Sequence, residues 1–458
     1  MKPTFDSWAV VILAAGQGTR MRSSTPKLLH PLAGRAMVRH VLEAAREAGF
    51  GRLLAVVSPD AADLRAALGE GVECVVQPEP LGTGDAVARV REAVAGCRQI
   101  AVLNGDVPLV SPETLVRLAA AHEENGADLT FLTAEVGEAG EYGIVERDGE
   151  GRVTGVVEAR ELAAPVAGST EINAGQYGFR AEWLWQHIDA IEPGTSGERY
   201  LTTLVPMAVR EGAAVQPIVV DDPDEVRGIN DRVQLAEAEA VLRGRINRGH
   251  QLAGVSIVDP ATTYIDAGVQ IGVDTIIEPN SYLRGDTSVG AGCRIGPNTV
   301  LRDARVGDRC RVEASTVEES TLEEDVEVGP YSHLRPGAYL CADAYVGNFA
   351  EVKNARLGRG VKMGHKSYIG DADVGDETNI GAGTITCNFD GRTKHRTVIG
   401  KGAFIGSDTM LVAPVTLGDG ARTGAGSVVT KDVPAGASAI GAPARIVRDG
   451  NRGDDERR

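Results

Sequence analysis

The stretch SVGAGCRIGPNTVLRDARVGDRCRV, residues 288–312, decides the fold of the second half of the chain. In it an aliphatic residue, usually followed by glycine, returns about every six residues, at Val289, Ile295, Val300, Val306 and Val312. A step of six fits neither an α-helix nor an alternating strand. It is typical of a solenoid in which each hexamer forms one flat side and three hexamers complete a coil. The aliphatic residue then points into the coil, and the small residue turns the corner.

The same period runs from about residue 257 to residue 440, with single-residue slips and one clear gap between Ile385 and Ile399. Roughly 180 residues at about 18 per coil predict on the order of ten coils. This hexapeptide signature resembles the left-handed parallel β-helix family. The handedness comes from that resemblance, because ordinary parallel crossovers are right-handed. On the repeats alone, a scaffold or trimerisation stalk without chemistry remains an alternative.

The composition predicts a multidomain protein and argues against nucleic-acid and membrane partners. A chain of 458 residues predicts two or three domains. Its 43% hydrophobic content is ample for large cores, and 57 glycines with only 4% aromatic residues suit a tightly coiled solenoid. The net charge of −17 argues against a nucleic-acid partner or an anionic membrane surface. Small anionic substrates remain possible, because local lysines and arginines can bind them.

The cysteines and the N-terminal segment predict a cytoplasmic protein. Six cysteines are scattered through the chain without metal-finger spacing, which is typical of a reduced cytosol. The apolar run at residues 8–15 is too short to span a membrane and has no basic leader. We interpret it as a buried first strand rather than as a signal peptide.

The first half of the chain, to about residue 227, alternates short apolar runs with helical stretches. The runs at 9–13, 53–57, 74–76 and 100–103 are predicted strands, and 37–48, 63–68 and 85–94 are predicted helices. This order predicts an α/β domain, Rossmann-like, with a mostly parallel sheet covered by helices. Ligands on such sheets bind beyond the carboxyl ends of the strands, so the loops that follow strands are the candidate site.

The loop after the first predicted strand, residues 13–21, has the sequence LAAGQGTRM. Its Gly-x-Gly turn allows backbone N–H groups to approach a phosphate, although a tight surface turn looks the same. It lacks the Gly-Lys-Ser/Thr ending of a Walker loop, and Pro26 and Lys27 follow instead. The pattern LAAGxGTRM…PK resembles the signature of the sugar-1-phosphate nucleotidyltransferases.

That resemblance implies a nucleotide site at this loop. The expected nucleotide contacts are Leu13, Ala14, Ala15, Gly16 and Lys27. Lys27 and Arg20 are the expected catalytic cations for the triphosphate. Gln77, Gly82 and Thr83, which follow another predicted strand, resemble the segment that contacts the base.

Two further positions resemble the metal ligands of these enzymes. Asp106 follows the predicted strand at 100–103, and Asn230 follows the segment 225–229. Oxygen ligands of this kind suit Mg²⁺. A lone aspartate in a turn is otherwise a capping residue, so the constellation, rather than Asp106 alone, supports the assignment.

The expected sugar contacts are Gly143, Glu158 and Asn173. They match the segments that hold N-acetylglucosamine 1-phosphate in the bifunctional uridyltransferase/acetyltransferase family. The implied reaction is attack of the sugar phosphate oxygen on the α-phosphorus of UTP, with pyrophosphate as the leaving group. It needs no protein nucleophile.

The chain is expected to divide into four parts. A nucleotidyltransferase domain is predicted at 1–228, a linker helix at 229–250, a β-helix domain at 251–445 and a disordered charged tail at 446–458. The linker follows from apolar residues at helical spacing over 231–248. A partner-binding helix is the alternative for that segment.

Polar side chains that a solenoid does not need gather between Arg335 and Asn388 and resemble the acetyltransferase site of the same bifunctional family. His365 matches the general base, which a neutral imidazole can provide near pH 7. A lone histidine in a solenoid is more often structural, and His333 and His395 are given no role. Glu351 or Asn388 is a candidate for orienting the imidazole.

The resemblance also implies ligands for both acetyl-transfer substrates. The expected glucosamine 1-phosphate contacts are Arg335, Lys353, Tyr368 and Asn379. The expected acetyl-CoA contacts are Ala382, Asn388, Phe389, Ser407, Ala425 and Arg445. Phe389 stands where the family often has tyrosine, and Arg445 takes the place of an arginine that is absent from its usual position.

The sequence therefore predicts a bifunctional enzyme that uses Mg²⁺, acetyl-CoA and UTP. It would acetylate glucosamine 1-phosphate and couple the N-acetylglucosamine 1-phosphate to UTP, giving UDP-N-acetylglucosamine for bacterial cell-wall synthesis. The family implies a homotrimer whose acetyltransferase site lies between solenoids. Two alternatives stay open: a monofunctional sugar-1-phosphate nucleotidyltransferase with a regulatory or oligomerising β-helix, and a non-catalytic trimeric scaffold.

Overall fold

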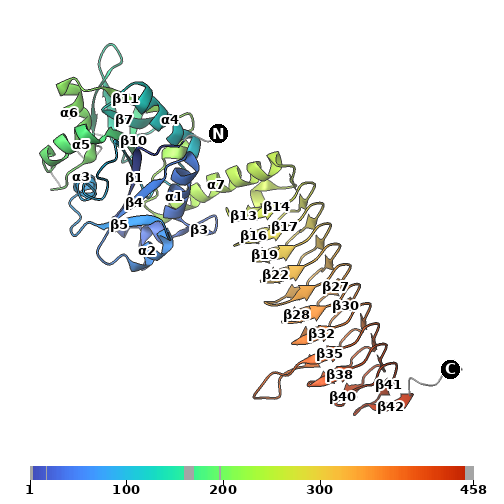
Figure 1. Ribbon diagram of the computed structural model, residues 1–458. Coiled ribbons are helices and arrows are strands. Elements are labelled where there is room, and N and C mark those ends of the chain that lie inside the picture. The colour runs from blue at the N-terminus through green and yellow to red at the C-terminus, as the bar shows by residue number, and fades with distance from the viewer. Residues whose placement is uncertain (1–3, 17, 159–169, 195–196, 449–458) are drawn as a thin grey trace. The chain divides into compact units, whose positions relative to one another are not determined.

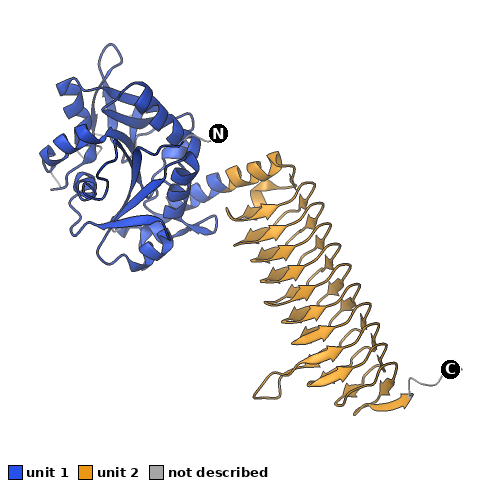
Figure 2. Ribbon diagram, in the orientation of Figure 1, with its two compact units in different colours: residues 1–242 blue, residues 243–458 orange. Residues whose placement is uncertain are grey.

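The computed structural model describes residues 4–16, 18–158, 170–194 and 197–448. The chain divides into two compact units, residues 1–242 and 243–458 (Figure 2). The division falls within helix α7 (Arg232–Leu252), which covers most of the predicted linker helix. No helix in the described ranges is both long enough and apolar enough to cross a membrane.

The first unit is built on a nine-stranded sheet with the order β11-β7-β10-β6-β1-β4-β5, and β8 and β9 extend from β10. Strands β6, β1, β4 and β5 are all parallel, whereas β10 runs antiparallel to both β6 and β7. The predicted parallel sheet is thus confirmed in the half that carries the nucleotide loop. The bounds are β1 Trp8–Ala14, β4 Arg52–Val57, β5 Val72–Val76, β6 Gln99–Asn104, β7 Leu129–Val136, β8 Ile144–Arg147, β9 Val153–Val157, β10 Thr170–Arg180 and β11 Val215–Val219.

Helices cover both faces of this sheet (Figure 1). Alternate residues of β1 point to opposite faces, so Val10 and Ile12 pack in one apolar cluster while Ala9 and Val11 pack in another. The helices are α1 Met37–Ala48, α2 Ala62–Leu68, α3 Thr83–Ala88, α4 Pro112–Glu124, α5 Ala181–His187 and α6 Leu204–Glu211. The helix predicted at 85–94 is shorter than expected and continues as turns, although Val94 stays buried.

The second unit is a left-handed parallel β-helix. Strands β12 to β37 each pair in parallel with the third strand further along the chain, which produces three sheets of 12, 10 and 9 strands. The first sheet runs from β12 (Ser256–Ile257) to β42 (Arg445–Arg448). The coils are stacked in one direction (Figure 1), as the six-residue period predicts.

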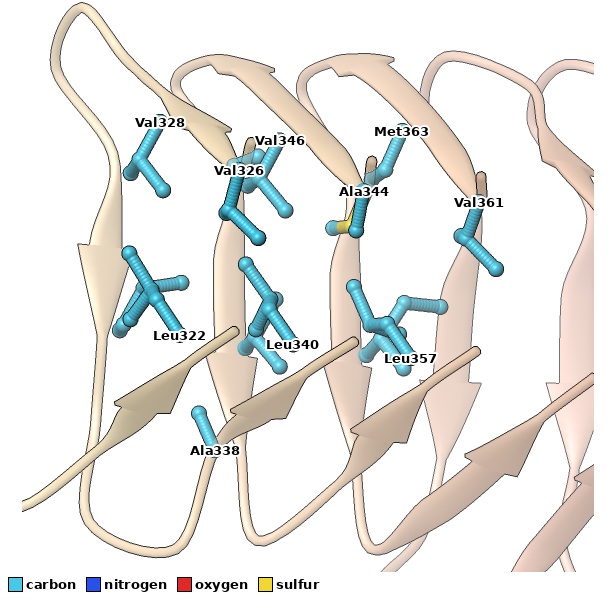
Figure 3. Packing of buried hydrophobic residues seen from close by; sticks show 14 of the residues in the cluster. Leu322, Val326, Val328, Ala338, Leu340, Ala344, Val346, Leu357, Val361 and Met363 are labelled. Atoms are coloured by element: carbon cyan, nitrogen blue, oxygen red, sulfur yellow. The ribbon is translucent and has the colours of Figure 1, made fainter. Parts of the chain in front are cut away.

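Aliphatic side chains from successive coils fill the interior of the solenoid. Figure 3 shows Leu322, Leu340 and Leu357 in one column and Val328, Val346 and Met363 in another. Val300 is one of two repeat residues, with Ile385, that do not point inward as predicted. In β19 (Val300–Arg302) the fully buried residue is Leu301, not Val300, because Leu301 pairs with the inward Leu283 of β16 (Tyr282–Arg284).

The predicted gap in the repeat is an extruded loop between β34 (Ile385–Cys387) and β35 (Thr397–Ile399) (Figure 1). At its start the inward residue is Thr386, with 1% of its surface exposed, whereas Ile385 points outward and is 39% exposed. Inside the loop, Phe389 forms an antiparallel bridge with Lys394. The loop is therefore a small hairpin inserted at one corner of the coil.

The end of the chain differs from the expected disordered tail. Residues 446–448 belong to β42, which pairs antiparallel with β41 (Ser438–Ile440). The β-branched Ile446 and Val447 favour an extended strand here. The predicted tail boundary at 446 is wrong for these three residues, and residues 449–458 lie outside the described ranges.

Candidate functional sites

Two adjoining cavities open in the first unit beyond the carboxyl ends of β1 and β6, with volumes of about 450 and 250 Å³. The larger is lined by the predicted residues Leu13, Arg20, Thr83, Asp106, Gly143, Glu158, Asn173 and Asn230. The smaller is lined by Leu13, Ala15, Gly16, Lys27, Gln77, Gly82, Thr83 and Asp106. Ala14 is buried on β1 and lines neither cavity. The parallel strands thus bring the remaining predicted nucleotide and sugar contacts to one site.

At the centre of this site Lys27 contacts both predicted metal ligands. Its Nζ lies 2.5 Å from Asp106 Oδ2 and 3.0 Å from Asn230 Oδ1. The Lys27 side chain is 10% exposed and that of Asp106 is 27% exposed. One carboxylate oxygen and one amide oxygen, from residues more than 100 positions apart in sequence, therefore face one point in the cavity.

Backbone contacts position these two oxygens. Ile229 N–H donates to Asp106 O at 2.9 Å, which brings Asn230 alongside Asp106. Gly105 N–H donates to Leu13 O at 3.0 Å and joins the ends of β6 and β1. A Cβ at Gly105 would lie 2.9 Å from Leu13 O, so this close approach requires glycine.

The two oxygens fit Mg²⁺. In the described ranges, no group of three or more His, Cys, Asp or Glu side chains is arranged to hold a metal. Mg²⁺ commonly uses one or two carboxylate or amide oxygens and takes its other ligands from substrate phosphates and water. Asp106 and Asn230 match that donor set.

The second expected cation, Arg20, is paired with an acidic side chain. Its Nη1 forms an ion pair with the Glu141 carboxylate at the rim of the larger cavity. Both side chains are substantially exposed, at 47% and 68%, so the pair is weak. Arg20 is thus close to the site and easily released.

The segment that follows β5 is hydrogen-bonded to a neighbouring loop. Arg199 N–H donates to Leu81 O and Gly84 N–H donates to Arg199 O, both at 2.8 Å. Thr83 Oγ1 accepts from Leu201 N–H at 2.9 Å. The buried Gln77, which lines the smaller cavity, donates its amide N–H groups to Gly82 O at 3.1 Å and Asp85 Oδ2 at 2.9 Å.

The residues on the sugar side of the site are also hydrogen-bonded to one another. Asn173 Nδ2 donates to the Tyr177 hydroxyl at 2.6 Å, and burial raises the pKa of Tyr177 well above its ordinary range. Glu158 Oε1 accepts from Thr202 Oγ1 at 2.6 Å. Burial also raises the pKa of Tyr142, whose hydroxyl accepts from Gly228 N–H. Tyr177, Tyr200 and Thr202 line the cavity but were not predicted, because no motif marks them.

In the second unit one outer face carries several of the predicted acetyl-transfer residues. The register of β25 (His333–Leu334), β28 (Glu351–Lys353) and β31 (Tyr368–Gly370) stacks His333, Glu351 and Tyr368 in one outward column. Arg335 and Lys353 follow the inward residues of two neighbouring strands and point to the same face. Arg335 Nη1 contacts Glu351 Oε1 at 2.7 Å.

Three cationic side chains, Arg335, Lys353 and Lys394, lie near one another on this face. The nearby ammonium of Lys394, from the extruded loop, and next the Arg335 guanidinium hold the pKa of Lys353 below its ordinary value. Lys394 was not predicted, because the loop lies outside the repeat and its fold back onto this face is not visible in the sequence. Three cations on one face are suited to a phosphate.

His365 ends strand β30 (Lys362–His365), is exposed, and lies opposite Asn348 of β27 (Tyr345–Asn348). Its imidazole has no hydrogen-bond partner within the ranges that the structure describes. Neither Glu351 nor Asn388, the two candidates for orienting it, is hydrogen-bonded to the imidazole in this structure. Glu351 is paired with Arg335, and Asn388 Nδ2 donates to Asp371 Oδ2 at 2.5 Å.

The corner occupied by His365 continues as a column of small residues. Backbone hydrogen bonds from Gly383 to Lys366, Asp408 to Ala382 and Gly426 to Ser407 stack the successive corners. The residues His365, Ala382, Ser407 and Ala425 therefore follow one another down the same edge of the solenoid. The predicted acetyl-CoA contacts Ala382, Ser407 and Ala425 thus share one edge of the solenoid with His365.

Other predicted residues lie on different surfaces of the chain. Asn379 is on β33 (Asn379–Ile380) of the first sheet, in register with Lys362, whereas Tyr368 is on the second sheet. Phe389 is 59% exposed in the extruded loop, and Arg445 is exposed on β42. A single chain therefore does not gather all the expected ligands on one face. His333 Nε2 lies 2.9 Å from Glu318 Oε2, and His395 Nε2 lies 2.7 Å from Asp390 Oδ2, so each imidazole has a local carboxylate partner.

Comparisons with known proteins agree with this division. The model of the MobA-like NTP transferase domain matches residues 10–199, and that of the bacterial transferase hexapeptide (six repeats) matches 268–303 and 396–431. A protein from Trichlorobacter lovleyi named bifunctional protein GlmU is 46% identical, over 96% of this chain and 97% of its own. Proteins of that name from Heliobacterium modesticaldum and Streptomyces avermitilis are each 45% identical, over 94% of this chain and 94% and 91% of their own.

The chain belongs to the bifunctional GlmU family. Membership confirms the predicted resemblance and the pairing of a nucleotidyltransferase with a hexapeptide transferase. The chain is an enzyme with uridyltransferase and acetyltransferase activities, one for each unit. The two alternatives, a monofunctional nucleotidyltransferase and a non-catalytic scaffold, do not fit membership of the GlmU family.

Proposed function

We propose that the second unit acetylates glucosamine 1-phosphate from acetyl-CoA and that the first unit couples the N-acetylglucosamine 1-phosphate to UTP. The products are UDP-N-acetylglucosamine and pyrophosphate. The observation that carries this proposal is the contact of Lys27 with Asp106 and Asn230 at the cavity of the first unit. The cationic face beside His365 supports the second reaction.

In uridyl transfer, the sugar phosphate oxygen forms a bond to the α-phosphorus of UTP and the bond to the pyrophosphate oxygen breaks. Asp106 and Asn230 would hold Mg²⁺, which supplies charge neutralisation at the phosphates when bound. Lys27 and Arg20 stabilise the charge that develops on the phosphates and the leaving group. The Gln77 carbonyl and the backbone near Gly82 contact the uracil edge.

The sugar lies in the larger cavity of the first unit. Asn173 and Glu158 offer amide and carboxylate groups to its hydroxyls and acetamido group. Their contacts with Tyr177 and Thr202 fix both side chains before substrate arrives. Preorganised polar groups of this kind lower the entropic cost of binding.

In acetyl transfer, the glucosamine nitrogen attacks the thioester carbonyl carbon, the carbon–sulfur bond breaks, and coenzyme A leaves as a thiol. His365 removes the amine proton, because only a neutral amine is nucleophilic. Arg335 and Lys353 bind the sugar phosphate, and Tyr368 and Asn379 bind the sugar. Ala382, Asn388, Phe389, Ser407, Ala425 and Arg445 contact acetyl-CoA.

We also propose that the protein is a homotrimer in the cytoplasm. Within one chain, some of the expected sugar and coenzyme contacts, such as Asn379, lie on a different sheet from Tyr368. A neighbouring solenoid would supply those contacts. The stacked rings of Tyr331 and Phe349, 63% and 60% exposed and 5.3 Å apart, offer an apolar corner for such packing. Six free thiols fit a reducing compartment.

The oligomer can be tested by subunit mixing. His365→Ala and Asn379→Ala chains, each inactive in acetyl transfer, are co-expressed with different tags and the mixed oligomers are purified. If subunits share the site, mixing restores part of the acetyl transfer. Monomers in light scattering, or mixtures that stay inactive, would contradict the shared site.

The two reactions are tested by omitting one component at a time from an assay with glucosamine 1-phosphate, acetyl-CoA, UTP and Mg²⁺. Free thiol should require acetyl-CoA and glucosamine 1-phosphate only. Pyrophosphate should require UTP, Mg²⁺ and either both acetylation substrates or added N-acetylglucosamine 1-phosphate. Pyrophosphate release that needs no acetylated sugar would contradict the proposed order.

A further inference from the structure

The Lys27 ammonium occupies the position expected for a bound cation. It lies between Asp106 Oδ2 and Asn230 Oδ1, at 2.5 and 3.0 Å. Both oxygens belong to the proposed metal ligands, and the Lys27 side chain is largely buried, with 10% of its surface exposed. The ammonium and a metal ion bound to these oxygens would compete for one place.

We propose that Lys27 acts as an internal counterion that keeps Mg²⁺ out of the nucleotide-free site, so that the metal enters together with the nucleotide. The inference rests on the proposed uridyl transfer and adds an order of events to it. Arrival of the triphosphate gives Lys27 another anion to contact. Its ammonium then leaves Asp106 and Asn230, and these two oxygens become available.

The contact distances support an exchange rather than joint occupancy. The distances at Lys27 are those of charge-assisted hydrogen bonds, whereas Mg²⁺ binds oxygen at about 2.0–2.1 Å. A divalent cation on the same two oxygens would lie within contact distance of the ammonium. Repulsion between like charges at that separation is strong in a partly buried site. One cation must therefore leave before the other binds.

The metal ligands do not depend on Lys27 for their positions. Asp106 is fixed through its backbone by Ile229, and Asn230 N–H donates to Gln234 Oε1 at 2.6 Å. Removing the Lys27 ammonium should therefore leave both oxygens facing the same point. A neutral side chain at position 27 then creates an open cation site.

The movement required of Lys27 is local. Its backbone lies in the short helix η2 (Lys27–Leu29), and its carbonyl accepts from His30 N–H at 3.2 Å. Gly18 packs against the Lys27 stem, and a Cβ there would lie 2.4 Å from Lys27 Cβ. With the backbone and stem fixed, rotation of the outer side-chain bonds can move the ammonium toward a phosphate in the adjoining cavity.

The test measures Mn²⁺, a spectroscopic substitute for Mg²⁺, binding to the full-length protein without nucleotide by electron paramagnetic resonance. Lys27→Met should bind Mn²⁺ at least about ten-fold more tightly than wild type, which corresponds to about 1.4 kcal/mol. Arg20→Met is the matched control, because it removes a positive charge from the larger cavity, which Asp106 and Asn230 also line, without opening the Asp106–Asn230 position. It should change Mn²⁺ affinity by less than about two-fold.

The double variant Lys27→Met/Asp106→Asn locates the gained binding. It should lose the gain, and a gain that persists would place the ion elsewhere and overturn the proposal. Equal or weaker Mn²⁺ binding by Lys27→Met would overturn it as well. Lys27→Gln provides a second neutral variant with the same expected gain if Lys27→Met does not fold.

The outcome is separable from that of the proposed function. Metal binding is measured without turnover, whereas the uridyl transfer is tested by Mg²⁺-dependent pyrophosphate release from wild type. If wild type releases pyrophosphate but Lys27→Met binds Mn²⁺ no more tightly than wild type, only the proposed exchange of Lys27 for the metal is refuted. A wild type that releases none refutes the proposed function itself.

Discussion

Gly82→Ala tests whether the segment after β5 positions UTP. Gly82 has φ 101° and ψ 176°, a conformation that only glycine adopts readily. A Cβ there would lie 2.5 Å from Arg199 O and 2.6 Å from Arg199 N. Because both contacts are to backbone, the strain cannot be relieved by turning a side chain.

The free-energy cost of Gly82→Ala follows from its backbone conformation and from its close contacts with Arg199. An alanine in this conformation costs about 1–3 kcal/mol. Moving the loop away from Arg199 would weaken two hydrogen bonds, each contributing about 1 kcal/mol. We expect a total of about 3 kcal/mol, which corresponds to about a 100-fold loss in kcat/KM for UTP if the loop shifts.

The assay is pyrophosphate release at saturating N-acetylglucosamine 1-phosphate and varied UTP, with acetyl transfer measured in parallel. Gly96→Ala is the matched control, since Gly96 also has a positive φ of 89° but nothing lies within 4 Å of its added Cβ. That control should keep the wild-type KM for UTP, and acetyl transfer should be unchanged in both variants. A folded Gly82→Ala protein with wild-type kcat/KM for UTP would refute the reasoning.

Three further changes should separate the two units and their sites. Asp371→Asn removes the carboxylate that accepts hydrogen bonds from Asn354 and Asn388 at 2.6 and 2.5 Å. The KM for acetyl-CoA should therefore rise several-fold while uridyl transfer persists. An unchanged KM for acetyl-CoA would contradict the role of Asn388. Leu357→Ala truncates a fully buried coil residue and should destabilise the second unit by about 3 kcal/mol. In calorimetry the unfolding temperature of the second unit should fall, and that of the first unit should stay the same. Burial lowers the pKa of His122 from 6.5 to about 4, so stability present above pH 6.5 is lost as the pH falls toward 4, by about 3 kcal/mol. Urea unfolding of the first unit should show that loss in wild type and a smaller one in His122→Gln.

The sequence predicts the fold well where one residue type recurs with a fixed period. The six-residue step predicts the coil, since the interior accepts aliphatic side chains at one position in six. The period alone does not specify which of two neighbouring aliphatic residues points inward. Leu301 rather than Val300 is inside because ladder pairing with Leu283 decides the register.

The candidate sites were predictable where short motifs follow strands. Lys27, Asp106 and Asn230 converge because parallel strands end at one edge and the backbone of Ile229 contacts Asp106. Their mutual contact was not predictable, because motifs give identity and order but not side-chain pairing. Lys394 was missed for a similar reason, since the inserted loop folds back onto the solenoid outside the repeat.

The most direct test of the account is the pair of activities in His365→Ala. Acetyl transfer to glucosamine 1-phosphate should fall by about 100-fold or more, because the general base is lost. Uridyl transfer to N-acetylglucosamine 1-phosphate should stay at the wild-type rate. His333→Ala, which removes an imidazole paired with Glu318 on the same solenoid, should retain both activities. Wild-type acetyl transfer by His365→Ala, or loss of both activities in a folded protein, would contradict two separate sites with His365 as the base of the second.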